Sequence, residues 1–168
     1  MAHLFAIVGW HNAGKTTLAE ALVREYRRRG ERVAVIKHSR EGFSLDHPGT
    51  DTYRLSQAGS DVVAIVSSAG FAWMERPVEE PSLGELVDRL ATDIDVIIAE
   101  GFKRERCPKI EVMRPETGTE PIASIDELVA IVSDEIVDTR PVPRFQFADA
   151  AKLVDYLNSV FDQLDPDS

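Results

Sequence analysis

The stretch Gly9-Trp10-His11-Asn12-Ala13-Gly14-Lys15-Thr16-Thr17 decides the fold, because it matches the phosphate-binding pattern G-x-x-x-x-G-K-[ST]. It directly follows the apolar run 3–8 and directly precedes a helical pattern, which is the context that the motif requires. Backbone N–H groups of such a loop converge on an anion, and the dipole of the following helix adds positive potential. The sequence therefore predicts a site for a nucleoside triphosphate.

Two side chains of the loop have specific expected roles. Lys15 can reach the β and γ phosphates, and Thr16 can ligate Mg²⁺. Trp10 occupies a variable position, where an aromatic ring either lines a pocket or packs on a neighbouring loop, and the sequence leaves both readings open. The residues expected to bind the nucleotide are Gly9, Asn12, Ala13, Gly14, Lys15, Thr16 and Thr17.

Length and composition indicate an ordinary globular protein. The chain has 168 residues, of which 43% are hydrophobic, and this length suits one compact domain. The net charge of −10 disfavours binding to nucleic acid. A single cysteine, Cys107, and a start that does not look like a signal segment predict a cytoplasmic protein. No apolar stretch approaches the roughly 18 to 20 residues that span a bilayer, so we expect no membrane insertion.

Strand and helix patterns alternate along most of the chain. The apolar run 3–8, the helical pattern 16–29 and the apolar run 32–37 form a βαβ unit. A long polar stretch, 38–51, follows. We expect further helices at 52–58, 82–90 and 148–164, an antiparallel pair at 61–67 and 71–75, and buried strands at 95–99, 109–113 and 128–132.

These elements predict the α/β class. We expect a three-layer fold like that of P-loop NTPases, with a mostly parallel central sheet, helices on both faces and antiparallel strands at an edge. One domain would cover residues 1–164, and residues 165–168 would form a flexible tail.

Ligands of open α/β sheets bind beyond the carboxyl ends of the strands, so polar groups that follow strands are candidates. Glu100 ends the apolar run 96–99, where a P-loop protein keeps the carboxylate that binds Mg²⁺. Asp46 lies in the long loop, where a carboxylate either organises Mg²⁺ or a water aimed at the γ phosphate, or only shapes a turn. Lys103 either neutralises phosphate or is simply exposed, and Arg54 either faces an anion or is solvated.

Three segments together resemble the molybdopterin-guanine dinucleotide biosynthesis adapter family, MobB. They are GWHNAGKTTL, the stretch IKHSREGFSLDHPGTDTYRLSQAG from residue 36 to 59, and IIAEGFKRERCPKIEVMR from residue 97 to 114. The resemblance covers roughly residues 4 to 135 of the sequence, and its second and third segments are more specific than the phosphate loop.

The resemblance implies a GTP-binding protein that assists the nucleotidyltransferase attaching GMP to molybdopterin. It implies at most weak GTP hydrolysis, a homodimer formed through an extended sheet, and molybdopterin as a further candidate ligand. Asp46 and Glu100 would be the acidic residues on the magnesium side and the candidate catalytic residues, with Thr16 as a third metal ligand. The residues themselves do not determine the base, because the N-K-x-D guanine signature is absent.

Two other functions use the same loop. A small-molecule kinase would need an acceptor pocket and a basic lid, for which Arg104 and Arg106 are sparse candidates. A GTP-dependent metallochaperone would favour a site rich in His and Cys, and four histidines with one cysteine supply little of it. The adapter is therefore the preferred hypothesis.

Overall fold

In the computed structural model, the described residues are 2–39, 41–44, 46–90, 92–135 and 138–164. They group into two compact units. The described residues of Met1–His38 and Leu83–Ser168 form the first, and those of Ser39–Ser82 form the second. The predicted flexible tail, 165–168, lies outside the described residues.

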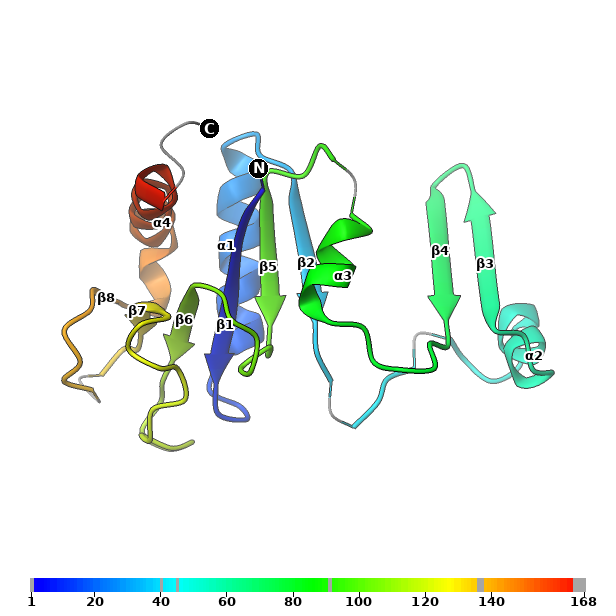
Figure 1. The fold of residues 1–168 in the computed structure, drawn as a ribbon, viewed down its shortest axis with the longest axis horizontal. Coiled ribbons are helices and arrows are strands. Elements are labelled where there is room, and N and C mark those ends of the chain that lie inside the picture. The colour runs from blue at the N-terminus through cyan, green and yellow to red at the C-terminus, as the bar shows by residue number, and fades with distance from the viewer. Residues whose placement is uncertain (1, 40, 45, 91, 136–137, 165–168) are drawn as a thin grey trace. The chain divides into compact units, whose positions relative to one another are not determined.

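Parallel strands form a six-stranded sheet in the first unit, in the order β2-β5-β1-β6-β7-β8 (Figure 1). Neighbouring strands of this sheet all pair in parallel, which confirms the predicted parallel central sheet and the α/β class. Strand β8 was not predicted, because two residues carry no periodic pattern. The strands are β1 (His3–Gly9), β2 (Val33–Lys37), β5 (Val96–Glu100), β6 (Lys109–Val112), β7 (Leu128–Val132) and β8 (Arg144–Phe145).

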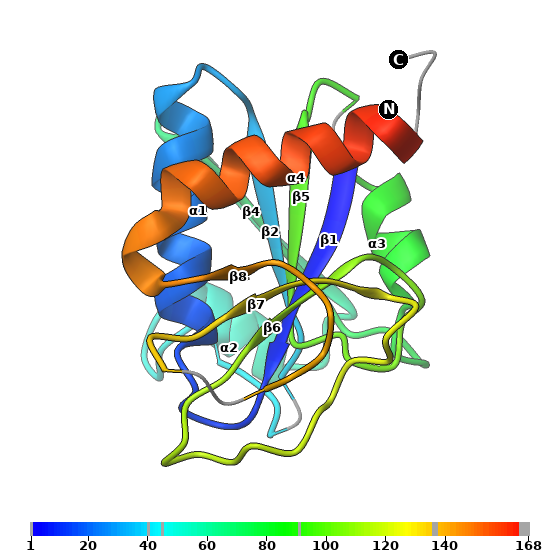
Figure 2. The same ribbon diagram turned by 90° about the vertical axis from the view of Figure 1, so that its left-hand side faces the viewer.

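The core of the first unit has two layers because successive side chains of a strand point to opposite faces. In β1, Phe5 and Ile7 pack on the face that α1 (Lys15–Arg28) and α4 (Ala150–Leu164) cover. Ala6 and Val8 pack on the other face, with Leu83 of α3 (Leu83–Asp88). Figures 1 and 2 show α1 and α3 on opposite sides of the sheet. The predicted three-layer arrangement is therefore confirmed.

The helix after the phosphate loop is amphipathic. Leu18, Leu22 and Tyr26 recur every four residues, and all three are buried against the sheet. Helix α4 is preceded by a 3₁₀ turn, Phe147–Asp149, so it begins two residues later than the pattern predicted. Among the described residues, no helix has the length and apolarity needed to cross a membrane.

The second unit consists of α2 (Asp51–Gln57) and a hairpin of β3 (Val62–Ser67) and β4 (Gly70–Glu75). Thr50 caps α2, because its side-chain oxygen accepts a hydrogen bond from the Tyr53 N–H. The two strands pair antiparallel, as predicted, but they form a separate two-stranded sheet instead of the edge of the central one. A tight turn sets Ser67 opposite Gly70, so the two strands pair with each other without any other strand. The sequence pattern predicts this local pairing but does not say which sheet the pair joins.

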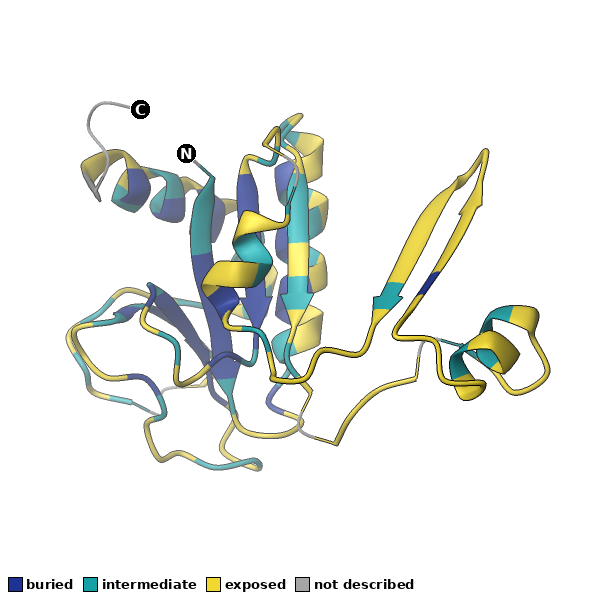
Figure 3. Cartoon of the chain, turned by 45° about the vertical axis from the view of Figure 1, so that its right-hand side comes forward, coloured by how far each residue is buried: buried dark blue, intermediate teal, exposed yellow. Residues whose placement is uncertain are grey.

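Burial differs sharply between the two sheets (Figure 3). Every residue of β5 is buried, whereas β3 and β4 are exposed along most of their length. The exposed residues of the hairpin include Ile65, Val66, Phe71 and Trp73. The hairpin thus carries an apolar surface that the described residues of its own unit leave uncovered.

Candidate phosphate-binding site

The phosphate loop joins the end of β1 to the start of α1. Asn12 and Gly14 have φ values of 61° and 101°, and these left-handed conformations turn the chain tightly. Gly14 is the N-cap of α1 and provides no side-chain cap. The first N–H groups of the helix therefore have no intrahelical or capping acceptor, which leaves them to bind an anion.

Two glycines of the loop are required by close approach. A Cβ at Gly9 would lie 2.5 Å from the carbonyl oxygen of Val112 in β6. A Cβ at Gly14 would lie 2.9 Å from two ring carbons of Phe147. The motif glycines thus let the loop pack against the neighbouring strand and the segment before α4.

The Lys15 ammonium lies within the loop. Its Nζ donates hydrogen bonds to the carbonyl oxygens of Gly9 at 3.1 Å and Trp10 at 2.8 Å. Burial lowers the pKa of Lys15 below its usual value of 10.5. The negative charge of Glu100 opposes this lowering, and the positive charge of Lys37 adds to it. A partly desolvated cation beside free helical N–H groups is suited to a phosphate.

Glu100 lies at the carboxyl end of β5 and is only 6% exposed. Both of its carboxylate oxygens accept from the Thr16 hydroxyl at 3.0 Å. Lys37 pairs with Glu100 across the parallel register, and its Nζ lies 3.2 Å from Oε1. A hydroxyl and a carboxylate in contact provide the hard oxygen ligands that Mg²⁺ prefers, so the donor set fits this metal.

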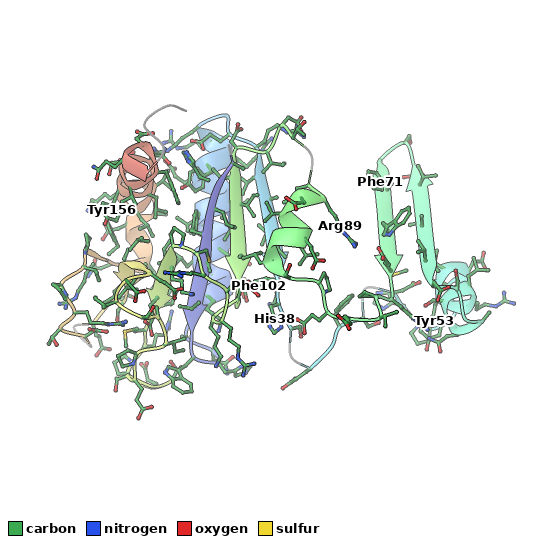
Figure 4. The ribbon with its side chains drawn as sticks, viewed as in Figure 1. His38, Tyr53, Phe71, Arg89, Phe102 and Tyr156 are labelled. Carbon is green, nitrogen blue, oxygen red and sulfur yellow. The ribbon has the colours of Figure 1, made fainter. Side chains whose placement is uncertain are left out.

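The ends of β1, β2 and β5 meet at this point, as expected of parallel strands. The N–H of His38 donates to the Glu100 carbonyl at 2.9 Å, and the N–H of Gly101 donates to the Ile7 carbonyl at 3.0 Å. The His38 and Phe102 rings lie side by side, with centroids 5.4 Å apart (Figure 4). The polar residues that follow these three strands are therefore neighbours, as the sequence predicts for groups beyond the carboxyl ends of parallel strands.

Asp46 belongs to the second unit, unlike Thr16 and Glu100. Its Oδ1 accepts from the His47 N–H at 2.8 Å and from the Thr50 hydroxyl at 2.7 Å. The hydrogen bond from Thr50 lowers the pKa of the Asp46 carboxyl. These contacts shape the turn before α2, and a role for Asp46 at a metal remains a prediction.

The structure decides between the two readings of Trp10 and shows two contacts of the loop that the sequence did not predict. The Trp10 ring packs on Gly118, and its Nε1 donates to the Glu120 carbonyl at 3.0 Å, so this aromatic packs on a neighbouring loop. Arg114 donates from Nε to the Ala13 carbonyl at 3.1 Å, and Phe147 lies against Gly14. The place of Arg114, just past an apolar strand, was the signal that could have revealed it.

The fold and the loop define the class: an α/β protein with a phosphate-binding loop between β1 and α1. The model of the family MobB, molybdopterin guanine dinucleotide synthesis protein B, matches residues 4–134. The chain belongs to this family.

Relatives and solved structures agree with this assignment. The chain is 40% identical over 133 residues to the molybdopterin-guanine dinucleotide biosynthesis adapter protein of Haemophilus influenzae, covering 77% of this chain and 73% of that protein. It is 34% identical over 161 residues to the adapter protein of Escherichia coli, covering 94% and 92%. A crystal structure of molybdopterin-guanine biosynthesis protein B matches with a TM-score of 0.70 and 27% identity, covering 94% of this chain and 97% of that chain.

Proposed function

We propose that this chain is a GTP- and Mg²⁺-binding adapter in molybdenum cofactor biosynthesis. It assists a MobA-like nucleotidyltransferase that attaches GMP to molybdopterin, forming molybdopterin guanine dinucleotide. The family and the names of the relatives support the pathway. The observation that carries nucleotide binding is the junction of Lys15, the uncapped start of α1 and the Thr16–Glu100 pair.

The residues divide the work of binding. Thr16 and Glu100 would hold Mg²⁺, and we keep Asp46 as a second acidic candidate on the magnesium side. Lys15 and the loop N–H groups of residues 12–17 would hold the phosphates, apart from the Ala13 N–H, which donates to the Trp10 carbonyl at 3.2 Å. Bound Mg²⁺ would neutralise phosphate charge. The molybdopterin contact is assigned to no residue.

Turnover of GTP by this chain alone should be slow. The sequence offers no obvious arginine finger or strongly placed catalytic base, and the Glu100 carboxylate accepts a hydrogen bond from the Thr16 hydroxyl and pairs with Lys37. We therefore treat hydrolysis as weak at most and as secondary to the adapter role.

The proposal includes a homodimer. β3 and β4 hydrogen-bond only to each other among the described strands, so each has a free edge next to exposed Val66 and Phe71. An isolated hairpin is marginally stable, and free strand edges are templates for pairing with another chain. Extension of this sheet by a second copy would cover both features.

Three further observations concern localisation and the two alternative functions. The single cysteine, Cys107, is a free buried thiol, which suits the reducing cytoplasm. Among the described residues, no cluster of three or more His, Cys, Asp or Glu side chains could hold a metal ion, which disfavours the metallochaperone. Nothing in the names of the relatives favours the small-molecule kinase.

Calorimetric titration with GTP and ATP, each with and without Mg²⁺, tests nucleotide binding. We expect GTP to bind more tightly than ATP and Lys15→Ala to abolish binding. Lys152→Ala is the matched control, because the Lys152 side chain is 76% exposed and lies on α4. Equal affinity for ATP, or full binding by Lys15→Ala, would contradict the proposal.

A second experiment tests the adapter role. The rate at which purified transferase attaches GMP to molybdopterin is measured with and without this chain. We expect a higher rate with the wild type and no gain with Lys15→Ala. An unchanged rate in the presence of GTP and Mg²⁺ would refute the role.

A further inference from the structure

One turn of the first unit contacts the phosphate loop at two points. Residues 114–120 follow β6 and fold back, with an antiparallel bridge between Arg114 and Gly118. We call this segment the 114–120 turn. At the far end of the turn, residues 118–120 contact Trp10: the Trp10 ring packs on Gly118, and its Nε1 donates to the Glu120 carbonyl. At the near end of the turn, Arg114 donates a hydrogen bond to the Ala13 carbonyl. The turn therefore contacts both the start and the end of the loop.

The near contact is the more constrained of the two. Arg114 Nε donates to the Ala13 carbonyl at 3.1 Å, and the guanidinium carbon lies 4.7 Å from the centroid of the Phe147 ring. The same ring contacts Gly14, where a Cβ would lie 2.9 Å from two ring carbons. Ala13 is fully buried. Arg114 and Phe147 thus fix the Ala13–Gly14 peptide from outside the loop.

The direction of this peptide has a consequence for binding. In a trans peptide the C=O and N–H bonds point in opposite directions. Arg114 binds the Ala13 carbonyl on the side of the loop that faces the 114–120 turn. The Gly14 N–H of the same peptide therefore points away from that turn. No protein group among the described residues accepts from this N–H. It is therefore presented to a ligand, next to the uncapped start of α1.

We propose that Arg114, supported by Phe147, is a positioning residue of the phosphate loop that sets its affinity for polyphosphate through the Ala13–Gly14 peptide. This rests on the proposed function, because it names a determinant of the same site. The planar guanidinium matters more than its charge, since it must stack on the ring and donate from Nε at once. A lysine ammonium has no plane to stack on the ring and places no donor at the position of Nε.

Binding of three ligands to Arg114→Ala tests the proposal: GTP, GDP and inorganic tripolyphosphate, each with Mg²⁺. Loss of one hydrogen bond that orients the loop should weaken all three by a similar factor, about tenfold. Arg24→Ala, which removes an equal charge from the exposed face of α1, should leave all three unchanged. Weakening of GTP and GDP with tripolyphosphate unaffected would mean contact with the nucleoside, and would overturn the proposal. Unchanged affinity for all three would overturn it too.

Two milder variants separate geometry from charge. Arg114→Lys keeps the charge and should bind as weakly as Arg114→Ala, whereas wild-type affinity would refute the stacked geometry. Phe147→Leu keeps an apolar contact with Gly14 but removes the aromatic face, and should weaken binding in the same direction. Thermal unfolding of each variant verifies that the fold is intact, and these two variants serve if Arg114→Ala does not fold.

Trp10 offers a readout that needs no nucleotide. The chain has two tryptophans, so Trp73→Phe leaves Trp10 as the single reporter. Adding Arg114→Ala to this background should increase quenching of Trp10 by iodide, because the loop loses one of its two contacts with the 114–120 turn. Unchanged quenching would count against the proposal. This measurement remains valid if the wild type bound no GTP, a result that would refute the proposed function instead.

Discussion

Substitution of Glu100 by glutamine tests the contribution of Mg²⁺ to nucleotide binding separately from the other contacts of the site. The amide has nearly the same size as the carboxylate and still offers an oxygen to the Thr16 hydroxyl, which donates to Glu100 at 3.0 Å. What is lost is the negative charge. Lys37, the ion-pair partner of Glu100, has a side chain that is 59% exposed, so water can solvate the ammonium after the substitution.

The expected magnitudes for stability and binding differ. A pair with such an exposed partner contributes about 0 to 1 kcal/mol, so the free energy of unfolding should change by less than about 1 kcal/mol. Loss of an anionic ligand should weaken the Mg²⁺-dependent part of GTP binding roughly 10- to 100-fold, or about 1.4 to 2.8 kcal/mol. In EDTA the variant should bind GTP at least as well as the wild type, because a carboxylate repels the phosphates.

The assay is calorimetric titration of GTP in excess Mg²⁺ and in EDTA, for the wild type and Glu100→Gln. Glu20→Gln on the exposed face of α1 is the control for net charge, because the Glu20 side chain is 58% exposed. Its ratio of the two affinities should match that of the wild type. The reasoning is wrong if Glu100→Gln keeps the full gain from Mg²⁺, or if it loses equal affinity in EDTA.

Three further predictions concern packing, pH and assembly. Gly9→Ala should destabilise the fold by about 1 to 3 kcal/mol and lower Tm by roughly 2 to 10 °C, because the new Cβ would lie 2.5 Å from the Val112 carbonyl oxygen. Gly84→Ala should leave Tm unchanged, because no atom lies within 4 Å of the position of its Cβ. Glu25 accepts hydrogen bonds from Arg28 and Arg29, which lower its pKa from 4.5 to about 2. The contribution of Glu25 to the free energy of unfolding is therefore present above pH 4.5 and is lost as the pH falls toward 2. In denaturant titrations Glu25→Gln should remove that part of the pH dependence of stability, and an unaltered pH dependence would contradict the assignment. If the proposed homodimer forms through the hairpin, Phe71→Asp should yield monomer in analytical ultracentrifugation, because Phe71 is exposed on β4. Ser159→Asp, at an exposed residue of α4, should leave the dimer intact. A dimer that survives Phe71→Asp would exclude the hairpin as the interface.

The sequence alone predicted the main strands and helices of the first unit and the phosphate loop. Apolar runs that end in polar residues, with a helical pattern after Gly14, are enough to predict parallel strands and a phosphate loop, because local periodicity reports burial. Glu100 was found in this way, since the strand before it is apolar on both faces. Thr16 and Lys15 followed from the motif spacing.

Tertiary structure decided the contacts between segments that are distant in the chain. Arg114 and Ala13 are 101 residues apart, and no local pattern records that the guanidinium reaches that carbonyl. The pairing of Lys37 with Glu100 depends on the order of strands in the sheet, which places β2 beside β5. Likewise, β3 and β4 form their own sheet because their hydrogen bonds are satisfied locally, and a period of two does not specify which sheet a strand joins.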